Sequence, residues 1–120
     1  MGKITTHILD TASGKPAAGI QIILRRAGSD KILTDVKTNA DGRCDNPLLM
    51  GEALTPGHYQ IDFHVGAYFA ATNFTTTGAS PGGIAFLNVV PVAFGINDAE
   101  ANYHIPLLIS PYGYSTYRGS

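Results

Sequence analysis

Two histidines, one near each end of the chain, could carry acid–base chemistry. His7 lies in the apolar run at residues 4–9, and His104 lies in the run at residues 103–110. Imidazole has an ordinary pKa of about 6.5, so it can gain or lose a proton near neutral pH. A single histidine in a strand is more often structural than catalytic. For two histidines on separate apolar strands, both roles stay open.

An arginine and the last four residues are further candidates for chemistry. Arg43 follows a tight turn at residues 39–42, a position where an arginine is usually exposed. Its alternative role is to hold a carbonyl or an anion through the planar donors of its guanidinium. The terminal Tyr-Arg-Gly-Ser would ordinarily be frayed. It continues a run of tyrosines, however, which indicates that the tail packs against the domain.

The elements that position these residues have the pattern of an all-β domain. The 14 glycines and 7 prolines separate short runs rich in Ile, Val, Thr, Phe and Tyr. Pro91 indicates an edge strand or a bulge. We expect about seven or eight strands packed as two antiparallel sheets, with one short helical turn at residues 66–73 and an exposed loop at 75–83. The expected strands span residues 4–9, 20–26, 32–38, a very short stretch near 43, 58–65, 84–96, 103–110 and 114–117.

The alternation along the first and last long strands predicts which way the histidines point. His7 lies opposite the Ile4 face, and His104 lies opposite the Ile105 face. If the isoleucine faces line the core, both histidines point outward, beside Leu9 and Leu108. An outward face that carries leucine and histidine suggests burial against another subunit.

Composition limits the class of protein. The 120 residues fit a single domain, 1–120, and a charged fraction of only 14% favours an oligomer. The net charge of −1 and the lack of a basic stripe argue against nucleic acid as a partner. No window reaches the roughly 20 apolar residues of a membrane span, and no signal-peptide pattern begins the chain, so we expect a cytoplasmic protein. Cys44 is the only cysteine, and we interpret it as a small buried side chain rather than a nucleophile.

Three segments resemble the 5-hydroxyisourate hydrolases, the enzymatic branch of the transthyretin family. They are residues 4–10 (ITTHILD), residues 38–43 (TNADGR), and residues 103–120 with their terminal YRGS. The terminal YRGS is the most specific of these motifs, because true transthyretins share the fold without this ending. The chain departs from the family pattern at Ala67, where Asp is common, and at Ala93, where Arg is common.

The resemblance implies a transthyretin-like (prealbumin-like) sandwich of two four-stranded antiparallel sheets with at most one short helix. It also implies a homotetramer, a dimer of dimers, with active sites in a channel between the dimers. The implied reaction is hydrolysis of 5-hydroxyisourate in urate catabolism, without metal or cofactor. The implied catalytic residues are His7, Arg43, His104 and Ser120, and the implied substrate-binding residues are His7, Arg43, Tyr117, Arg118 and Gly119.

The expected mechanism uses the two histidines as an acid–base pair, with Ser120 orienting the water and Arg43 holding the developing oxyanion. Which histidine is the base stays open at this point. Two alternatives remain: a non-enzymatic tetramer that binds small aromatic ligands, as transthyretin does, and a β-sandwich adhesion or scaffold module.

Overall fold

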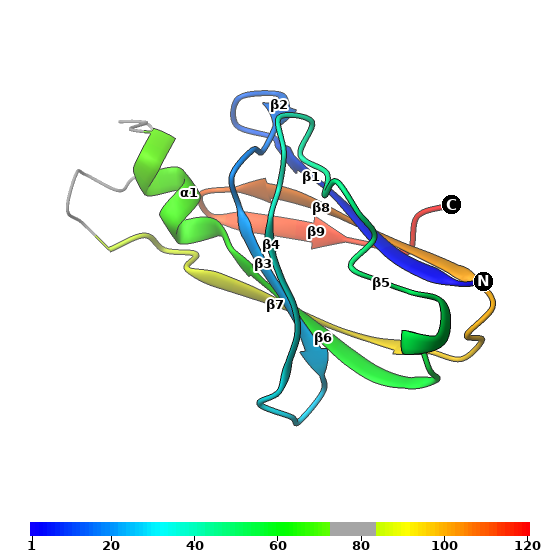
Figure 1. Cartoon of the computed structure of the whole chain (residues 1–120). Helices are drawn as coiled ribbons and strands as arrows, with labels where there is room; N and C mark the ends of the chain where they lie inside the picture. Colours follow the sequence, from blue (N-terminus) through cyan, green and yellow to red (C-terminus); the bar gives the residue numbers. More distant parts are fainter. Residues whose placement is uncertain (73–83) are drawn as a thin grey trace.

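A computed structural model describes residues 1–72 and 84–120 as a two-layer β-sandwich with one short α-helix at its end (Figure 1). A 3-10 turn, Gly51–Ala53, joins the strand Leu49–Met50 to the strand Gly57–His64. The strands and the helix are β1 (Lys3–Asp10), β2 (Lys15–Pro16), β3 (Gln21–Arg26), β4 (Ile32–Lys37), β5 (Leu49–Met50), β6 (Gly57–His64), α1 (Val65–Thr72), β7 (Val89–Ile96), β8 (Asn102–Ser110) and β9 (Gly113–Thr116).

Each layer is one sheet. The first sheet runs β2-β1-β8-β9, with the two-residue β5 also paired to β1, and the second runs β4-β3-β6-β7. The transthyretin-like sandwich inferred from the sequence is therefore confirmed. The strand pairs of the described residues are antiparallel, as expected, except that β1 and β8 pair in parallel. Since these two strands are far apart in sequence and no hairpin joins them, no short turn fixes their relative direction.

The core lies between the two sheets and is filled by alternate residues of each long strand, as a two-sheet sandwich requires. On β1, Ile4 and Ile8 have no exposed surface, whereas Thr5 and His7 on the other face are partly exposed. On β8, Tyr103, Ile105, Leu107 and Ile109 are buried. The predicted inward and outward faces of both histidine strands are confirmed.

Some boundaries differ from the expected ones. β7 begins at Val89 rather than at residue 84, because its pairing with β6 begins at Val89, opposite His64. As Pro91 indicated, β7 is an edge strand. The short helix is present as α1, and the expected loop at residues 75–83 lies outside the described residues. None of the described helices is long and apolar enough to cross a membrane.

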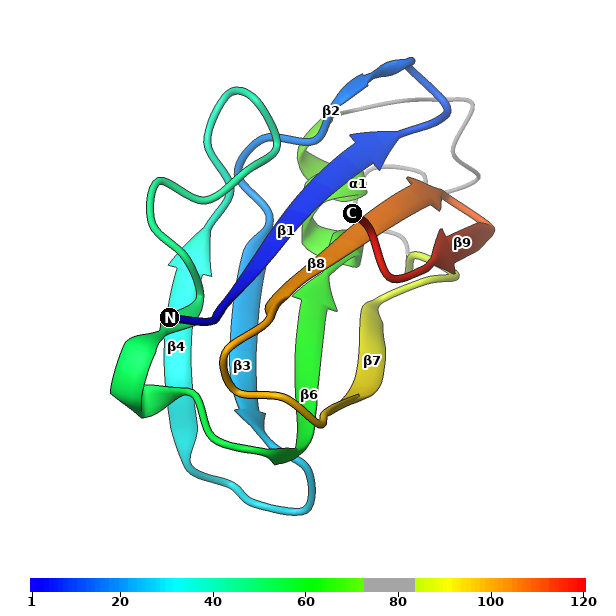
Figure 2. The same cartoon turned by 90° about the vertical axis from the view of Figure 1, so that its right-hand side faces the viewer.

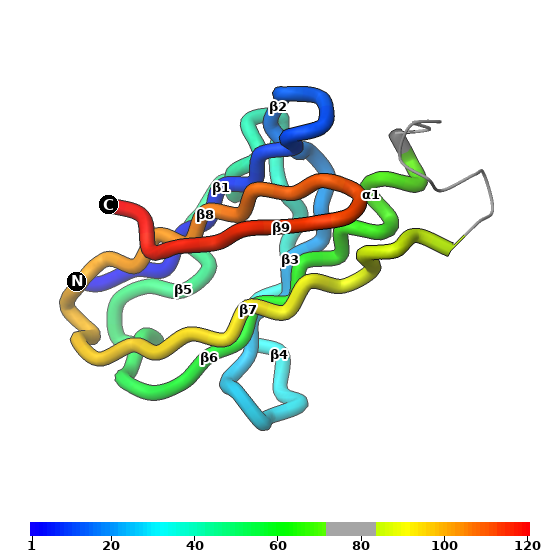
Figure 3. Tube along the Cα trace, turned by 180° about the vertical axis from the view of Figure 1, so that it is seen from behind, coloured from blue at the N-terminus to red at the C-terminus, as the bar shows by residue number. Residues whose placement is uncertain are grey.

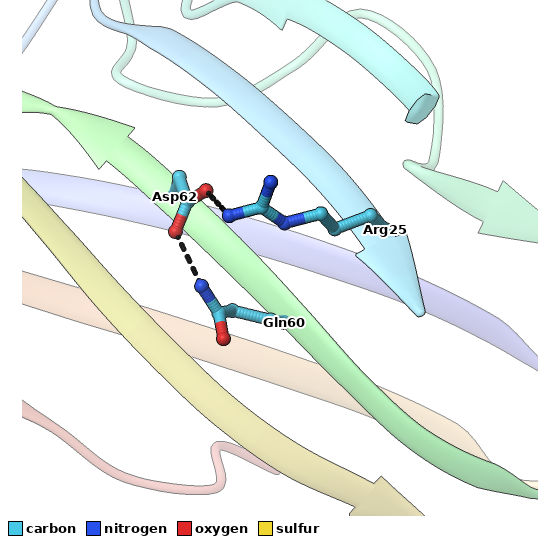
Figure 4. A network of polar contacts seen from close by, with 3 residues as sticks. All are labelled: Arg25, Gln60 and Asp62. Carbon is cyan, nitrogen blue, oxygen red and sulfur yellow. Dashed lines mark hydrogen bonds and ion pairs between the residues drawn. The ribbon is translucent and has the colours of Figure 1, made fainter. Parts of the chain in front are cut away.

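The outward face of the second sheet carries a polar network (Figure 4). The buried carboxylate of Asp62 accepts hydrogen bonds from Arg25 Nη2 at 2.5 Å and from Gln60 Nε2 at 2.8 Å. Ala93, where the family commonly has an arginine, pairs with Gln60 in the neighbouring strand. The cation that pairs with Asp62 is Arg25 of β3.

Candidate active site

The outward face of the first sheet carries three of the sequence-predicted residues, His7, Arg43 and His104, on or beside the strands β1 and β8 that Figure 2 shows side by side. β1 and β8 lie side by side at its centre, with Thr5 paired to His104 and His7 paired to Pro106. Because paired residues of neighbouring strands point to the same face, both histidines project away from the core. Residues of the chain about 100 positions apart thus share one surface.

A tightly built turn holds Arg43 beside this surface. The Asn39 side chain accepts backbone N–H bonds from Asp41 at 2.9 Å and from Arg43 at 3.2 Å. Gly42 has φ +73°, and a Cβ on it would lie 2.5 Å from the carbonyl oxygen of Ile8, so only glycine fits there. Arg43 then forms an antiparallel bridge to His7, which places the two side chains on the same face.

The imidazole of His104 is held from two sides. Thr5 Oγ1 lies 2.9 Å from His104 Nδ1. On the opposite edge of the ring, the C-terminal tail turns back over β8, and Gly119 N donates to His104 O at 2.7 Å. A Cβ on Gly119 would lie 2.6 Å from His104 Cδ2, so the glycine lets the tail approach the ring closely.

A pocket of about 340 Å³ opens beside these residues. Arg43, His104 and Thr5 of β1 all line this pocket. Sequence reasoning missed Thr5 and most of the other lining residues, since nothing in their spacing marks them and the pairing of β1 with β8 is not visible in the sequence. The further lining residues are Lys3, Thr6, Cys44, Asp45, Asn46 and Pro47.

The electrostatics of the pocket favour a neutral His104. Partial burial, the Arg43 cation and His7 together lower the pKa of His104 below its ordinary value of 6.5. Burial, with a contribution from Asp45, raises the pKa of the Cys44 thiol, so this thiol stays protonated and is a poor nucleophile. Among residues 1–72 and 84–120, no three His, Cys, Asp or Glu side chains are grouped so that they could hold a metal ion.

The remaining predicted residues lie at the end of the tail. Tyr117 and Arg118 line a separate groove of about 300 Å³, formed with β7 residues and Tyr103. The Arg118 guanidinium lies 4.4 Å above the Tyr103 ring, and its Nη2 donates to Asn102 O at 3.3 Å. In the isolated chain these two residues therefore face the edge of the sandwich, whereas Gly119 faces His104. Ser120 follows directly and is exposed.

Comparison with known proteins places this arrangement in a family. The HIUase/Transthyretin family model matches residues 4–119. A Rhizobium meliloti (strain 1021) protein named 5-hydroxyisourate hydrolase 2 is 50% identical over 121 residues, covering 99% of this chain and 97% of that protein. The solved structure of Klebsiella pneumoniae 5-hydroxyisourate hydrolase is 34% identical, with a TM-score of 0.80 and full coverage of both chains.

A transthyretin from Sparus aurata is 24% identical, with a TM-score of 0.81 over 98% of this chain and 96% of that one, which shows the fold alone. The family model spans nearly all of the chain, and a relative of similar length shares half of its residues. This chain therefore belongs to the HIUase/transthyretin family.

Proposed function

We propose that this chain hydrolyses 5-hydroxyisourate to 2-oxo-4-hydroxy-4-carboxy-5-ureidoimidazoline, a step of urate (purine) catabolism in the cytoplasm. The observation that carries the proposal is a pocket in which a guanidinium lies beside an imidazole of lowered pKa. Full-length relatives at about half identity bear the name of this hydrolase, which supports the same substrate.

His104 acts as the general base. A base must be neutral to accept a proton, and its lowered pKa keeps His104 neutral at pH 7. It removes a proton from a water molecule, and the resulting hydroxide oxygen attacks a carbonyl carbon of the cyclic amide. Arg43 donates hydrogen bonds to the oxyanion that forms on this carbonyl.

The carbon–nitrogen bond of the ring then breaks, and the leaving nitrogen takes a proton. We assign the proton donor to His7, which faces the same surface through its bridge to Arg43. Ser120 orients the attacking water, and Gly119 seats the tail against His104. Tyr117 and Arg118 contribute to substrate binding by holding the tail in place, because they pack in the groove beside β7 and Tyr103. The reaction so written needs no metal ion, and chelators should leave its rate unchanged.

The active form is a homotetramer, a dimer of dimers. Within residues 1–72 and 84–120, no further strand pairs with the outer edges of β7 and β9, which run along one side of the sandwich (Figure 3), and such edges tend to pair with other chains. Tyr117 between them is 58% exposed, and Val89 is 38% exposed. The outward face of the first sheet also carries Leu9 and Leu108, which a second pair of subunits would cover. Covering that face turns the open pocket into a closed channel.

A coupled spectrophotometric assay tests the function. Urate oxidase generates 5-hydroxyisourate in place, and its decay is followed with and without the protein. We expect decay well above the spontaneous rate, and a loss of roughly 10² to 10⁴ in rate for His104→Asn and for His7→Asn. His58→Asn is the matched control, because His58 is exposed on the other sheet. An unchanged decay rate with the wild-type protein would refute the proposal and favour a ligand-binding tetramer.

A further inference from the structure

The hydroxyl of Thr5 contacts one ring nitrogen of His104, Nδ1. The two residues are register partners of the parallel strands β1 and β8, so they occupy the same face. Thr5 Oγ1 and His104 Nδ1 are 2.9 Å apart. Parallel strands at the centre of a sheet hold such a pair at fixed spacing, and Thr5 has a β-branched side chain with few rotamers.

The rest of the ring is also constrained. Gly119 approaches Cδ2 so closely that a Cβ there would lie at 2.6 Å, with a second contact at 3.3 Å to Cγ. Thr5 therefore holds one edge of the imidazole, and the tail covers the other. Since Thr5 contacts Nδ1 and the tail lies against Cδ2, Nε2 is the ring nitrogen that these two contacts leave for the pocket that Arg43 and His104 line.

The chemistry of the neighbours decides which nitrogen carries the proton. A neutral imidazole has one N–H donor and one lone-pair acceptor, and the partner of one nitrogen sets the role of the other. Arg43 can only donate, so a lone pair suits the pocket side of the ring. Nδ1 then carries the hydrogen, and a threonine hydroxyl can accept it.

We propose that Thr5 is a positioning residue: its Oγ1 accepts the Nδ1–H of His104 and so keeps the Nε2 lone pair directed at the reacting water. The inference rests on the proposed function only for its effect on rate, since the protonation of His104 in the free protein is independent of any substrate. Thr5 touches no reacting atom and acts through His104.

Two substitutions separate this role from simple packing. Thr5→Val keeps the shape and removes the acceptor, whereas Thr5→Ser keeps the hydroxyl. Without the acceptor, the His104 ring is free to adopt the tautomer with hydrogen on Nε2. In that tautomer Nε2 has no lone pair with which to accept a proton from the water. We expect Thr5→Val to lower kcat roughly ten- to hundredfold with little change in KM, as loss of a partner that orients a histidine does in metal sites. Thr5→Ser should restore most of this loss.

Long-range ¹H–¹⁵N spectra of the histidine rings provide the direct readout at a pH above 6.5, where His104 is neutral. We expect hydrogen on Nδ1 in the wild-type protein and in Thr5→Ser, and a shift toward Nε2 in Thr5→Val. Thr11→Val is the matched control, because the Thr11 hydroxyl donates to Ile109 O on the same sheet and lies away from the pocket. It should leave the His104 signals and kcat unchanged.

The wild-type spectrum alone can overturn the inference, so the test stands even if Thr5→Val does not fold. Hydrogen on Nε2 in the wild-type protein would refute the role of Thr5 while leaving the hydrolase activity intact. An unchanged spectrum and an unchanged kcat in folded Thr5→Val would refute it as well. If the wild-type protein does not hydrolyse 5-hydroxyisourate but shows the expected spectra, the proposed function fails and the assignment of the proton stands.

Discussion

A methyl group added at Gly119 tests whether the close seat of the tail on His104 matters for turnover. In Gly119→Ala the new Cβ would start 2.6 Å from His104 Cδ2 and 3.2 Å from Pro106 Cγ. Both neighbours lie on β8, at the centre of the first sheet, so the tail is the part that moves. The φ of Gly119 is not in the left-handed region, so the substitution adds crowding without backbone strain.

The size of the displacement follows from these contacts. Moving the Cβ from 2.6 Å to an ordinary 3.4 Å from Cδ2 needs a shift of about 0.8 Å. The same shift stretches the bond from Gly119 N to His104 O, now 2.7 Å, to the limit of hydrogen bonding. The lost bond is worth about 1 kcal/mol, which is small against the stability of the domain. Misplacement by about 1 Å costs up to 10² in rate, so we expect roughly a ten- to hundredfold loss of kcat/KM.

Gly113→Ala is the matched control for this experiment. Gly113 lies in β9 of the same C-terminal hairpin, and the nearest atom to its added Cβ is Ser110 Oγ at an unstrained 3.8 Å. Initial rates of 5-hydroxyisourate decay and thermal unfolding curves should be compared for the wild-type protein and both variants. Activity of Gly119→Ala equal to that of Gly113→Ala would show that the seat of the tail on His104 is not needed for turnover.

Five other outcomes are expected. Arg43→Lys should lose tenfold or more in kcat/KM, because an ammonium lacks the planar donors that hold an oxyanion, and steady-state kinetics will measure it. The acid-side fall of kcat/KM should have its midpoint below pH 6.5, since burial, Arg43 and His7 lower the pKa of the base, His104, from its ordinary value. Arg43→Met should move this fall toward higher pH. Gly42→Ala should lower the free energy of unfolding in urea by more than the roughly 1–2 kcal/mol that its φ of +73° alone would cost, because the new Cβ would also lie 2.5 Å from the carbonyl oxygen of Ile8. Deleting residues 117–120 should abolish most turnover while leaving the fold, as circular dichroism will show, because the tail adds no strand to the sheets.

Much of the fold was predictable because the sequence alternates cleanly. The strands around Ile4, Ile22 and Ile61 each bury every second residue, and this period of two is visible without a structure. Pro91 narrowed the place of β7 to an edge strand or a bulge, and the structure has β7 at the edge of its sheet. The outward direction of His7 and His104 followed from the same alternation.

The direction and order of pairing were not predictable in this way. Period-two alternation is identical in parallel and antiparallel strands, so it could not reveal that β1 runs parallel to β8. The contact of Thr5 with His104 depends on that register, since a slip of one residue would turn Thr5 toward the core. The two-residue strands β2 and β5 lie below the length at which a pattern can be recognised.

The parallel pair β1–β8 also explains how stability and activity are linked in this domain. The same two strands that bury Ile4, Ile8 and Leu107 on one face carry Thr5 and His104 on the other. A substitution that loosens the core beneath them changes the spacing of the pair above, because both faces share one backbone ladder. Tail variants act from outside this ladder and should therefore lower the rate with only a small fall in melting temperature. Comparing the rate with the melting temperature should therefore separate substitutions in the core under β1 and β8 from substitutions in the C-terminal tail.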